Sequence, residues 1–235
     1  MGILYIVPTP VGNLEDITLR ALKVLQEVDL ILCEDTRQSK KLLDHFKISK
    51  QLMAYHKFNE YKSVESLMDR LRTGANIAMV SDGGTPGISD PGHILVKACV
   101  ESGITVQTLP GATAFVPALI NSGFATDEFV FIGFLPHKKG RQTALKKIAL
   151  DERTQILYES PYRVVKLMDE LKQHIGTERL ISASREISKM FEETVRGTAD
   201  DLILRFTTKE PKGEFVVIID AAPSKKKRDK DKEEE

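Results

Sequence analysis

Four segments of this chain carry the residue types that line ligand-binding loops, and each follows an apolar run. They are Pro8–Asn13, Glu34–Arg37, Asp82–Gly92 and Pro110–Ala114. The third is the richest, with four glycines and two prolines. Glycine lets a ligand approach the backbone closely, and proline fixes the path of a loop before a ligand binds. Its spacing is neither that of a dinucleotide-binding fingerprint nor that of a P-loop, so another kind of ligand loop is expected.

Alternating strand-like and helix-like segments must position these loops. Strands are expected at 2–7, 30–33, 52–55, 76–81 and 104–109, and helices at 17–28, 39–46, 63–72 and 94–101. This alternation predicts a parallel sheet covered by helices. Because the carboxyl ends of parallel strands meet at one edge, the four loops are expected to form a single cleft. Its lining suits a flat, mostly neutral ligand with a few polar groups.

The second half of the chain predicts a different sheet. Strands are expected at 129–132, 154–158, 179–183, 193–197 and 214–219, and helices at 142–150, 162–174 and 198–206. Some of these strands are joined too briefly for parallel crossovers, which favours a mixed sheet. The chain is therefore expected to be an α/β protein. Its parts would be a mostly parallel domain over 1–118, a mixed-sheet α/β domain over 119–222 and a disordered charged tail over 223–235.

Composition excludes several classes of protein. With 41% hydrophobic and 29% charged residues among 235, the chain is typical of a folded water-soluble protein. The net charge of zero creates no global basic field, so any nucleic-acid contact must come from local patches. The two cysteines form no C-x-x-C pair and the five histidines show no ligand spacing, so we expect reduced thiols and no metal site. Without a signal peptide or a membrane span, a cytoplasmic location is expected.

Several motifs carry a resemblance to a known family. Tyr5–Thr18 resembles the opening motif of the tetrapyrrole methylase superfamily, in its ribosomal RNA methyltransferase branch. Ser81–Gly87 resembles the cofactor loop of that superfamily, and Pro110–Ala114 its third motif. The branch itself is matched by Cys33–Arg37, Phe134–Pro136, Glu159–Arg163 and Arg185–Lys189. The resemblance runs in order from about Gly2 to Ile219 and does not include the tail.

The resemblance implies a class III methyltransferase-like fold that binds S-adenosyl-L-methionine in the cleft between its two domains. It also implies a homodimer that methylates the ribose 2′-oxygen of a cytidine in the decoding region of 16S rRNA, within the 30S subunit. The cofactor contacts carried over are Pro8, Asp82, Gly83, Gly84, Ile88, Thr113, Ala114 and Tyr158, with Gly213 and Glu214 closing the adenine side. The tetrapyrrole enzymes carry Gly-Asp-Pro where this chain has Asp82-Gly83-Gly84-Thr85-Pro86. Asp82 is therefore expected either to contact the cofactor or to order the loop.

Methyl transfer from a sulfonium is an in-line displacement, so positioning of the acceptor supplies much of the acceleration. A ribose hydroxyl is a weak nucleophile, and a general base assists it by about 10²–10⁴-fold. Candidate catalytic residues are Glu159, Glu186, Lys189 and Glu192. Asp35 and Arg37 could instead orient the nucleotide. No motif selects one base among these candidates.

Two local patterns favour RNA binding. His137–Arg141, followed by Lys146 and Lys147, is a basic segment suited to phosphates, and Tyr55–Lys62 interleaves aromatic rings with cations. Each has an ordinary alternative, a solvated surface for the first and half-buried aromatic rings for the second. Arg163 and Arg185 each lie just after a predicted strand. For these two residues, the alternative to phosphate binding is an internal ion pair. The predicted RNA contacts are Arg37, Lys57, Lys138, Lys139, Arg141, Arg163 and Arg185.

Two other functions stay open at this point. A methylase of the same superfamily could act on a tetrapyrrole or another small molecule, although such a substrate requires no aromatic and basic arm. A binding module for RNA or ribosome assembly could keep the cleft without catalysis. The basic segments favour an RNA substrate, so rRNA methylation is the leading expectation.

Overall fold

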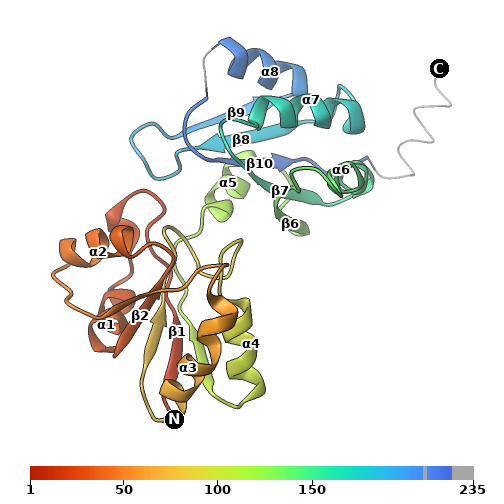
Figure 1. Cartoon of the computed structure of the whole chain (residues 1–235). Coiled ribbons are helices and arrows are strands. Elements are labelled where there is room, and N and C mark those ends of the chain that lie inside the picture. The colour runs from red at the N-terminus through yellow and green to blue at the C-terminus, as the bar shows by residue number, and fades with distance from the viewer. Residues whose placement is uncertain (209–210, 224–235) are drawn as a thin grey trace, which may run out of the picture. The chain divides into compact units, whose positions relative to one another are not determined.

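The described residues form two compact α/β units that divide between Thr113 and Ala114 (Figure 1). The computed structural model describes residues 1–208 and 211–223. From residue 224 onward the predicted charged tail lies outside the described residues. The division falls at 113/114, whereas the sequence pattern places it after residue 118.

The first unit is a five-stranded parallel sheet in the order β3-β2-β4-β1-β5. Its strands are β1 Ile3–Ile6, β2 Leu30–Cys33, β3 Leu52–Ala54, β4 Ile77–Met79 and β5 Thr105–Thr108. Its helices are α1 Leu19–Glu27, α2 Thr36–His45, α3 Glu60–Arg72 and α4 His93–Glu101, with a short 3₁₀ turn at Leu14–Asp16. The predicted parallel sheet with covering helices is confirmed.

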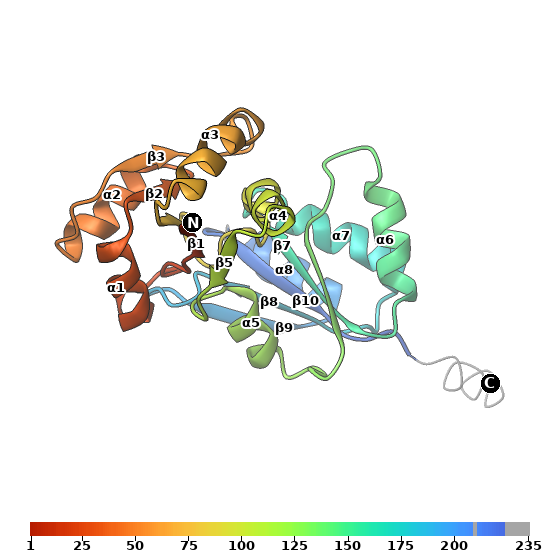
Figure 2. The same cartoon turned by 90° about the horizontal axis from the view of Figure 1, so that it is seen from below.

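Both faces of this sheet are buried, which is why its central strands are apolar without interruption. All four residues of β2 are buried, as expected for a parallel strand covered on both sides. Alternate residues belong to separate cores: Leu30 and Leu32 pack with residues of α3 and α4, and Ile31 and Cys33 with residues of α1 and α2. Figures 1 and 2 show these helix pairs on opposite faces of the sheet. The loops after the strands therefore emerge at one rigid edge.

The second unit contains a mixed five-stranded sheet in the order β6-β7-β10-β8-β9. Only β6 and β7 are paired in parallel, and the other neighbours are antiparallel. The strands are β6 Phe129–Phe134, β7 Thr154–Glu159, β8 Ile181–Arg185, β9 Glu193–Gly197 and β10 Phe215–Ile219. The helices are α5 Phe115–Ser122, α6 Arg141–Leu150, α7 Val164–Ile175 and α8 Ala199–Thr208. The predicted mixed sheet is confirmed.

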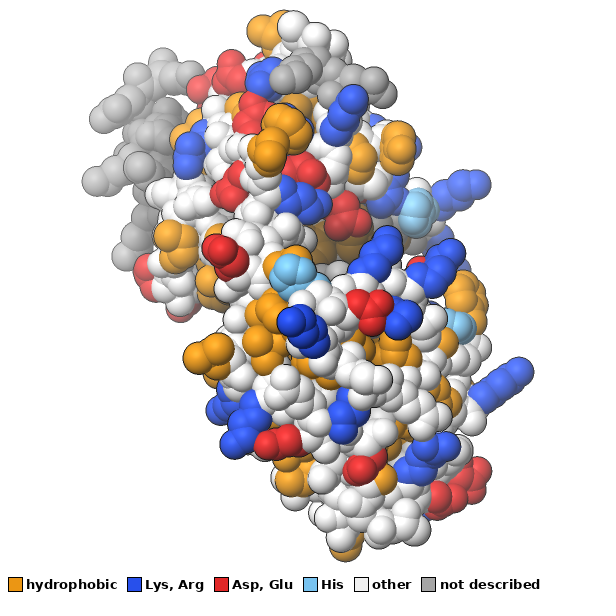
Figure 3. All heavy atoms as spheres, turned by 90° about the vertical axis from the view of Figure 1, so that its left-hand side faces the viewer, with side chains coloured by type: hydrophobic (Ala, Val, Ile, Leu, Met, Phe, Trp, Pro, Cys, Tyr) orange, Lys and Arg blue, Asp and Glu red, His pale blue; other side chains and the backbone are white. Residues whose placement is uncertain are grey.

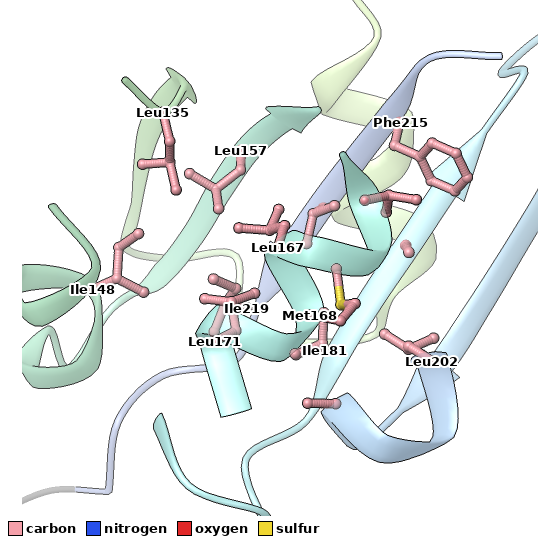
Figure 4. Close-up of a cluster of buried hydrophobic side chains, with 14 of the residues drawn as sticks. Leu135, Ile148, Leu157, Leu167, Met168, Leu171, Ile181, Leu202, Phe215 and Ile219 are labelled. Atoms are coloured by element: carbon pink, nitrogen blue, oxygen red, sulfur yellow. The ribbon is translucent and has the colours of Figure 1, made fainter. Parts of the chain in front are cut away.

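Helices cover both faces of the second sheet. Leu157 on β7, Leu167 and Leu171 on α7 and Phe215 on β10 are fully or almost fully buried in one core, as Figure 4 shows. On the other face, Ala118 and its neighbour on α5 pack in a smaller core with residues of β7 and β10. This packing explains why α5 belongs to the second unit and why the division precedes residue 118.

Strand β8 is displaced from its predicted position by two residues. The pattern predicts a strand over 179–183, but the strand runs from Ile181 to Arg185. Arg179 is buried, and its guanidinium donates to the carbonyl oxygens of Asp220 (2.6 Å) and Ile148 (3.1 Å). These bonds fasten the start of β8 to neighbouring segments, so Arg179 serves as a structural anchor. No helix in the described parts of the chain is both long and apolar enough to cross a membrane.

Candidate functional site

Hydrogen bonds join the loops that follow β1, β4 and β5 into one structure. Thr9 and Gly84 exchange two backbone hydrogen bonds of 2.9 and 2.8 Å. The Thr9 hydroxyl donates to the carbonyl of Ser81 (2.9 Å), and the Thr85 hydroxyl donates to the carbonyl of Ala112 (2.9 Å). We call residues 8–13, 81–92 and 110–113 the three-loop cluster. The predicted convergence of these loops within the first unit is therefore observed.

Glycine is required in the three-loop cluster where backbones approach closely. A Cβ added at Gly111 would lie 2.8 Å from the Pro8 Cβ. Gly84 has φ +93°, a conformation that other residues rarely adopt. Gly83 and Ile88, two more of the predicted cofactor residues, are both exposed on the middle loop. Pro8 and the three glycines thus position the cluster backbone, and the exposed residues leave one edge of it open.

Asp82 connects the three-loop cluster to the start of α2. Its Oδ1 accepts a hydrogen bond of 3.3 Å from the backbone N–H of Asp35. Desolvation raises the pKa of Asp82, and the Asp35 charge adds to this rise, whereas the Asp35 N–H lowers it. Asp35 caps α2 by accepting from the Arg37 N–H (2.8 Å), and its side chain pairs with the Arg37 guanidinium (2.6 Å). Hydrogen bonds from Arg37 lower the pKa of Asp35 to about 2, so this carboxyl is ionised at neutral pH.

Thr113 and Ala114 lie where the last cluster loop leads into α5, and both are half-buried. Tyr158 belongs to a separate aromatic group in the second unit. Its ring makes edge contacts with Phe131 (centroids 5.2 Å apart) and Phe134 (5.6 Å). Tyr158 packs on the α5 side of the sheet. Because side chains alternate along a strand, the next residue of β7 faces the other side.

That next residue, Glu159, has its carboxylate within a buried ion-pair network. The residue is 1% exposed, and Oε1 lies 2.8 Å from Nη2 of Arg163 and accepts from the Ser160 N–H (2.9 Å). Its Oε2 lies 3.7 Å from Nη2 of Arg141. A carboxylate held this way has its charge balanced within the protein. The geometry therefore favours a positioning role for Glu159 over the predicted role of general base.

The prediction that Arg141 contacts RNA is wrong, because the residue is only 5% exposed. Its guanidinium donates to Glu170 on α7 (2.6 and 2.8 Å) and to the carbonyl of Pro136 (3.2 Å). The basic run enters α6 at this point, and the first helical side chain points into the protein. Lys138 and Lys139, which precede it, are exposed and stay in the predicted RNA-binding set.

Arg163 and Arg185 form internal ion pairs, the alternative to RNA binding that the sequence left open for these two residues. Arg163 pairs with Glu159 and lies within hydrogen-bond distance of the His137 ring (2.7 Å). Arg185 donates to Glu193 (2.7 Å), which also pairs with Arg205. These hydrogen bonds lower the pKa of Glu193, the bond from Arg185 contributing most. Both arginines are mostly buried, with side chains 25% and 15% exposed.

The loop between β8 and β9 brings together other predicted catalytic residues. Nζ of Lys189 lies 2.8 Å from Oε1 of Glu186, and the Glu192 carboxylate accepts from the Ser188 N–H (2.7 Å). Glu186 and Ser188 have φ of 50° and 62°, so the backbone is strained on both sides of Ile187. A Cβ added at Gly213 would lie 2.1 Å from Oε1 of Glu186. Gly213 therefore lets the segment that leads into β10 approach this carboxylate closely, and the next residue, Glu214, is exposed.

The aromatic and basic segment after β3, Tyr55–Lys62, begins with a buried residue and contains exposed ones. Tyr55 is 2% exposed, and desolvation raises its pKa to about 12. Phe58 and Tyr61 are 93% and 78% exposed, and Lys57 is exposed beside them. Large exposed rings next to a cation suit stacking of unpaired bases. On the face in Figure 3, basic and acidic side chains are interspersed, in line with the zero net charge.

Sequence reasoning missed two features of the surface. Tyr162 is 93% exposed at the turn after β7, although its motif was recognised. Gln38 and Lys41 line a cavity between α2 and the three-loop cluster. Gln38 and Lys41 are spaced to lie on one face of a helix that follows the Glu34–Arg37 motif, and this spacing could have indicated that α2 lines a cavity. Among the described residues, no group of three or more His, Cys, Asp or Glu side chains is arranged to hold a metal ion.

A family model for Tetrapyrrole (Corrin/Porphyrin) Methylases matches residues 3–203. The chain belongs to the tetrapyrrole methylase family. Within that family it is 51% identical to "Ribosomal RNA small subunit methyltransferase I" of Synechocystis sp., over 94% of this chain and 80% of that protein. The protein of the same name from Escherichia coli O157:H7 is 47% identical, over 93% of this chain and 78% of that protein. The resemblance predicted from the motifs is confirmed.

Solved structures confirm the fold class of this tetrapyrrole methylase family member. Diphthine synthase superposes with a TM-score of 0.74 at 13% identity, covering 94% of this chain and 90% of that one. Uroporphyrin-III C-methyltransferase from Thermus thermophilus, complexed with S-adenyl homocysteine, gives a TM-score of 0.63 at 18% identity, covering 92% and 97%. At these identities the likeness concerns the fold alone.

Proposed function

We propose that this protein is an S-adenosyl-L-methionine-dependent methyltransferase that methylates the ribose 2′-oxygen of a cytidine in the decoding region of 16S rRNA. The observation that carries the proposal is the 51% identity to an rRNA small subunit methyltransferase over 94% of this chain. A match of this extent includes both α/β units, and so the surfaces that bind cofactor and substrate as well as the core.

The three-loop cluster fits the proposed cofactor. Gly83 is exposed and has no side chain, so a ligand can approach the backbone of this loop closely. Thr113 adds a small polar side chain. Asp82, also proposed as a cofactor contact, holds this loop against the start of α2 through its hydrogen bond from the Asp35 N–H. When bound, S-adenosyl-L-methionine supplies an electrophilic methyl group. Tyr158, Gly213 and Glu214 are proposed as further contacts.

Glu186 and Lys189 are the catalytic candidates that the geometry favours. Their side chains are 21% and 42% exposed, so both reach solvent while they pair with each other. Such a pair can orient a ribose hydroxyl and hold its proton after transfer. Glu159, by contrast, is enclosed by two guanidinium groups. We therefore assign Glu159 to positioning and the loop pair to the acceptor.

Exposed cations and rings provide the proposed RNA contacts. Lys138 and Lys139 suit phosphates, and Lys57 lies beside the exposed ring of Phe58. Base stacking on an aromatic ring contributes about 1–3 kcal/mol per base. We also propose that the protein acts as a homodimer in the cytoplasm, the compartment that an rRNA substrate requires. Light scattering coupled to size exclusion tests the dimer by its mass.

A transfer assay tests the function against its alternative. Tritiated S-adenosyl-L-methionine is incubated with the full chain and 30S subunits from cells lacking the endogenous enzyme, and in parallel with a tetrapyrrole. We expect label in 16S rRNA and none in the tetrapyrrole. Label in the tetrapyrrole alone would identify a small-molecule methylase. Cofactor binding without transfer to 30S subunits or to free rRNA would also contradict the proposal.

A further inference from the structure

The first unit contains a cavity of about 320 Å³ beside the three-loop cluster. One wall is a face of α2, from Gln38 through Lys41 and Leu42 to His45. The other wall consists of loop residues after β1 and β4, including Asp82. A volume of this size lies in the range of pockets that bind small ligands. The cavity therefore borders the loop assigned to the cofactor but has a wall of its own.

Local hydrogen bonds hold the two walls in place. Asp35 caps α2 and donates its own N–H to Asp82 (3.3 Å), which ties the helix to the cluster loop. Within the helical wall, Nζ of Lys41 donates to the Gln38 amide oxygen (3.3 Å). This bond engages the oxygen of the amide, so its NH₂ group is the part that can donate to a ligand. The cavity thus has a preformed polar wall.

One buried hydroxyl in this wall lacks a strong partner. Ser39 is 5% exposed, and its Oγ has no partner that meets hydrogen-bond geometry among the described residues. It lies near the thiol of Cys33, which is a weak partner. Buried hydroxyl groups are usually hydrogen-bonded, so an unsatisfied one calls for an explanation. Ser39 lines the cavity, so this observation independently supports a ligand there.

The polar groups match a cytosine nucleotide. A carboxylate accepts from the N4 amino group of cytosine, whereas uracil has a carbonyl oxygen at that position. Asp82 supplies the carboxylate, the Gln38 amide can donate to a ring acceptor, and Lys41 suits the neighbouring phosphate. Leu42 offers an apolar surface for the ring. Enzymes that act on a base extrude it into such a pocket, and a ribose methylase can use a base pocket of this kind to identify its nucleotide.

We infer that this cavity holds the base of the target cytidine and that Asp82 selects cytosine over uracil. The inference rests on the proposed rRNA methylation and adds the subsite that identifies the nucleotide. In this arrangement the loop that carries Asp82 contacts the cofactor, and the Asp82 carboxylate accepts a hydrogen bond from the base. The ribose of the bound nucleotide is then presented at the edge of the three-loop cluster.

Filling the cavity tests the inference. Gln38→Trp places a bulky ring at the rim of the cavity, and Lys40→Trp is the matched control, an exposed neighbour on α2 that does not line it. We expect Gln38→Trp to lower kcat/KM for 30S subunits by about 10- to 100-fold, the size of effect that the loss of one base-reading contact produces. The Kd for the cofactor and the melting temperature should match those of the control.

Substrate subunits carrying uridine at the target position provide the second arm. The unaltered chain should methylate them about 10- to 200-fold less efficiently than cytidine subunits, and Asp82→Asn should reduce this preference. The pocket assignment is overturned if Gln38→Trp keeps full activity, or if it loses cofactor binding together with activity. If Asp82→Asn keeps the full preference for cytidine over uridine, the assignment of Asp82 as the residue that selects cytosine is overturned. Failure of the unaltered chain on cytidine subunits overturns the proposed function itself, and the pocket with it.

Discussion

Glu159 carries its charge in the interior of the second unit, where the guanidinium groups of Arg163 and Arg141 balance it. The paired charges have given up their hydration, so the loss of one partner leaves the other uncompensated. Asp82 presents the opposite arrangement. It is a partly desolvated carboxylate, and the charge of the neighbouring Asp35 raises its pKa further. Glu159 thus contributes to the stability of the second unit, whereas Asp82 is part of the proposed binding site.

Glu159→Gln is expected to destabilise the protein by about 3 kcal/mol. This is the lower part of the range for broken buried pairs, because Arg163 is 25% exposed and can regain some water. Urea unfolding measures the change, and Glu152→Gln, at an exposed carboxylate, should leave the midpoint unaltered. A Glu159→Gln protein of normal stability that no longer transfers methyl groups would instead make Glu159 the general base.

Asp82→Asn is expected to stabilise the protein increasingly as the pH rises above the ordinary aspartate pKa of 3.8. A raised pKa means that the folded state binds the proton more tightly, so the wild type loses stability between 3.8 and the raised folded value. The variant has no such loss. Asp201→Asn is the control of opposite sign, because hydrogen bonds from Thr198 lower the pKa of Asp201. Unfolding curves between about pH 3 and 7 measure both, and equal slopes for the two variants would contradict the assignment.

Among the elements, the β8–β9 loop shows how strain and close contact shape a reactive surface. Two residues with positive φ surround Ile187, which is buried in the α5-side core of the second unit. The strained turn therefore keeps the Glu186–Lys189 pair partly exposed to solvent, while the side chain of Ile187 is buried in the core. The approach of Gly213 completes the arrangement.

Gly213→Ala is expected to cost at least about 1 kcal/mol more than Gly123→Ala, because the new methyl group overpacks against Glu186. Gly123 is the matched control, with φ +76° against +78° and nothing within 4 Å of an added Cβ. The free energy of unfolding is measured for both variants, alone and combined with Glu186→Ala. In the Glu186→Ala background the two substitutions should cost the same. A difference that persists there would show that the Glu186 contact is not its cause.

Local patterns predicted the elements well, and the reason is visible in particular segments. Leu30–Cys33 is apolar throughout because helices cover both faces of its strand, and the glycine-rich loop after β4 reads as a ligand loop because close backbone approach demands such residues. Long-range pairing was not predictable. Arg141 belongs to a basic run by sequence, yet its partner Glu170 lies 29 positions away on another helix. The α2 wall of the cavity could have been inferred from the helical spacing of Gln38 and Lys41, but the wall opposite it comes from distant loops.

For the whole molecule, the balance of charge decides how RNA would be bound. The formal net charge is zero, so local clusters rather than a general field must attract phosphates. Lys138 and Lys139 form such a cluster, while several arginines that resemble RNA contacts in the sequence are held in internal ion pairs. Removing one exposed lysine should therefore matter more for RNA than for folding.

Lys138→Glu is expected to weaken binding of rRNA and to reduce the slope of log Kd against log salt by about one, the effect of losing one phosphate contact. The Kd for S-adenosyl-L-methionine should not change. Lys97→Glu, the same charge reversal at an exposed position outside the basic segment, serves as the control. Filter binding over a salt series measures the slope. Equal loss of RNA and cofactor affinity would contradict this division of labour.

The proposed function requires that the methyl group reach a ribose oxygen of a cytidine. The direct measurement digests the methylated 16S rRNA to nucleosides and identifies the labelled one by chromatography and mass spectrometry. We expect 2′-O-methylcytidine, released from an alkali-resistant dinucleotide that maps to the decoding region. A label on a base, or on the ribose of another nucleotide, would contradict both the proposed reaction and the cytosine pocket.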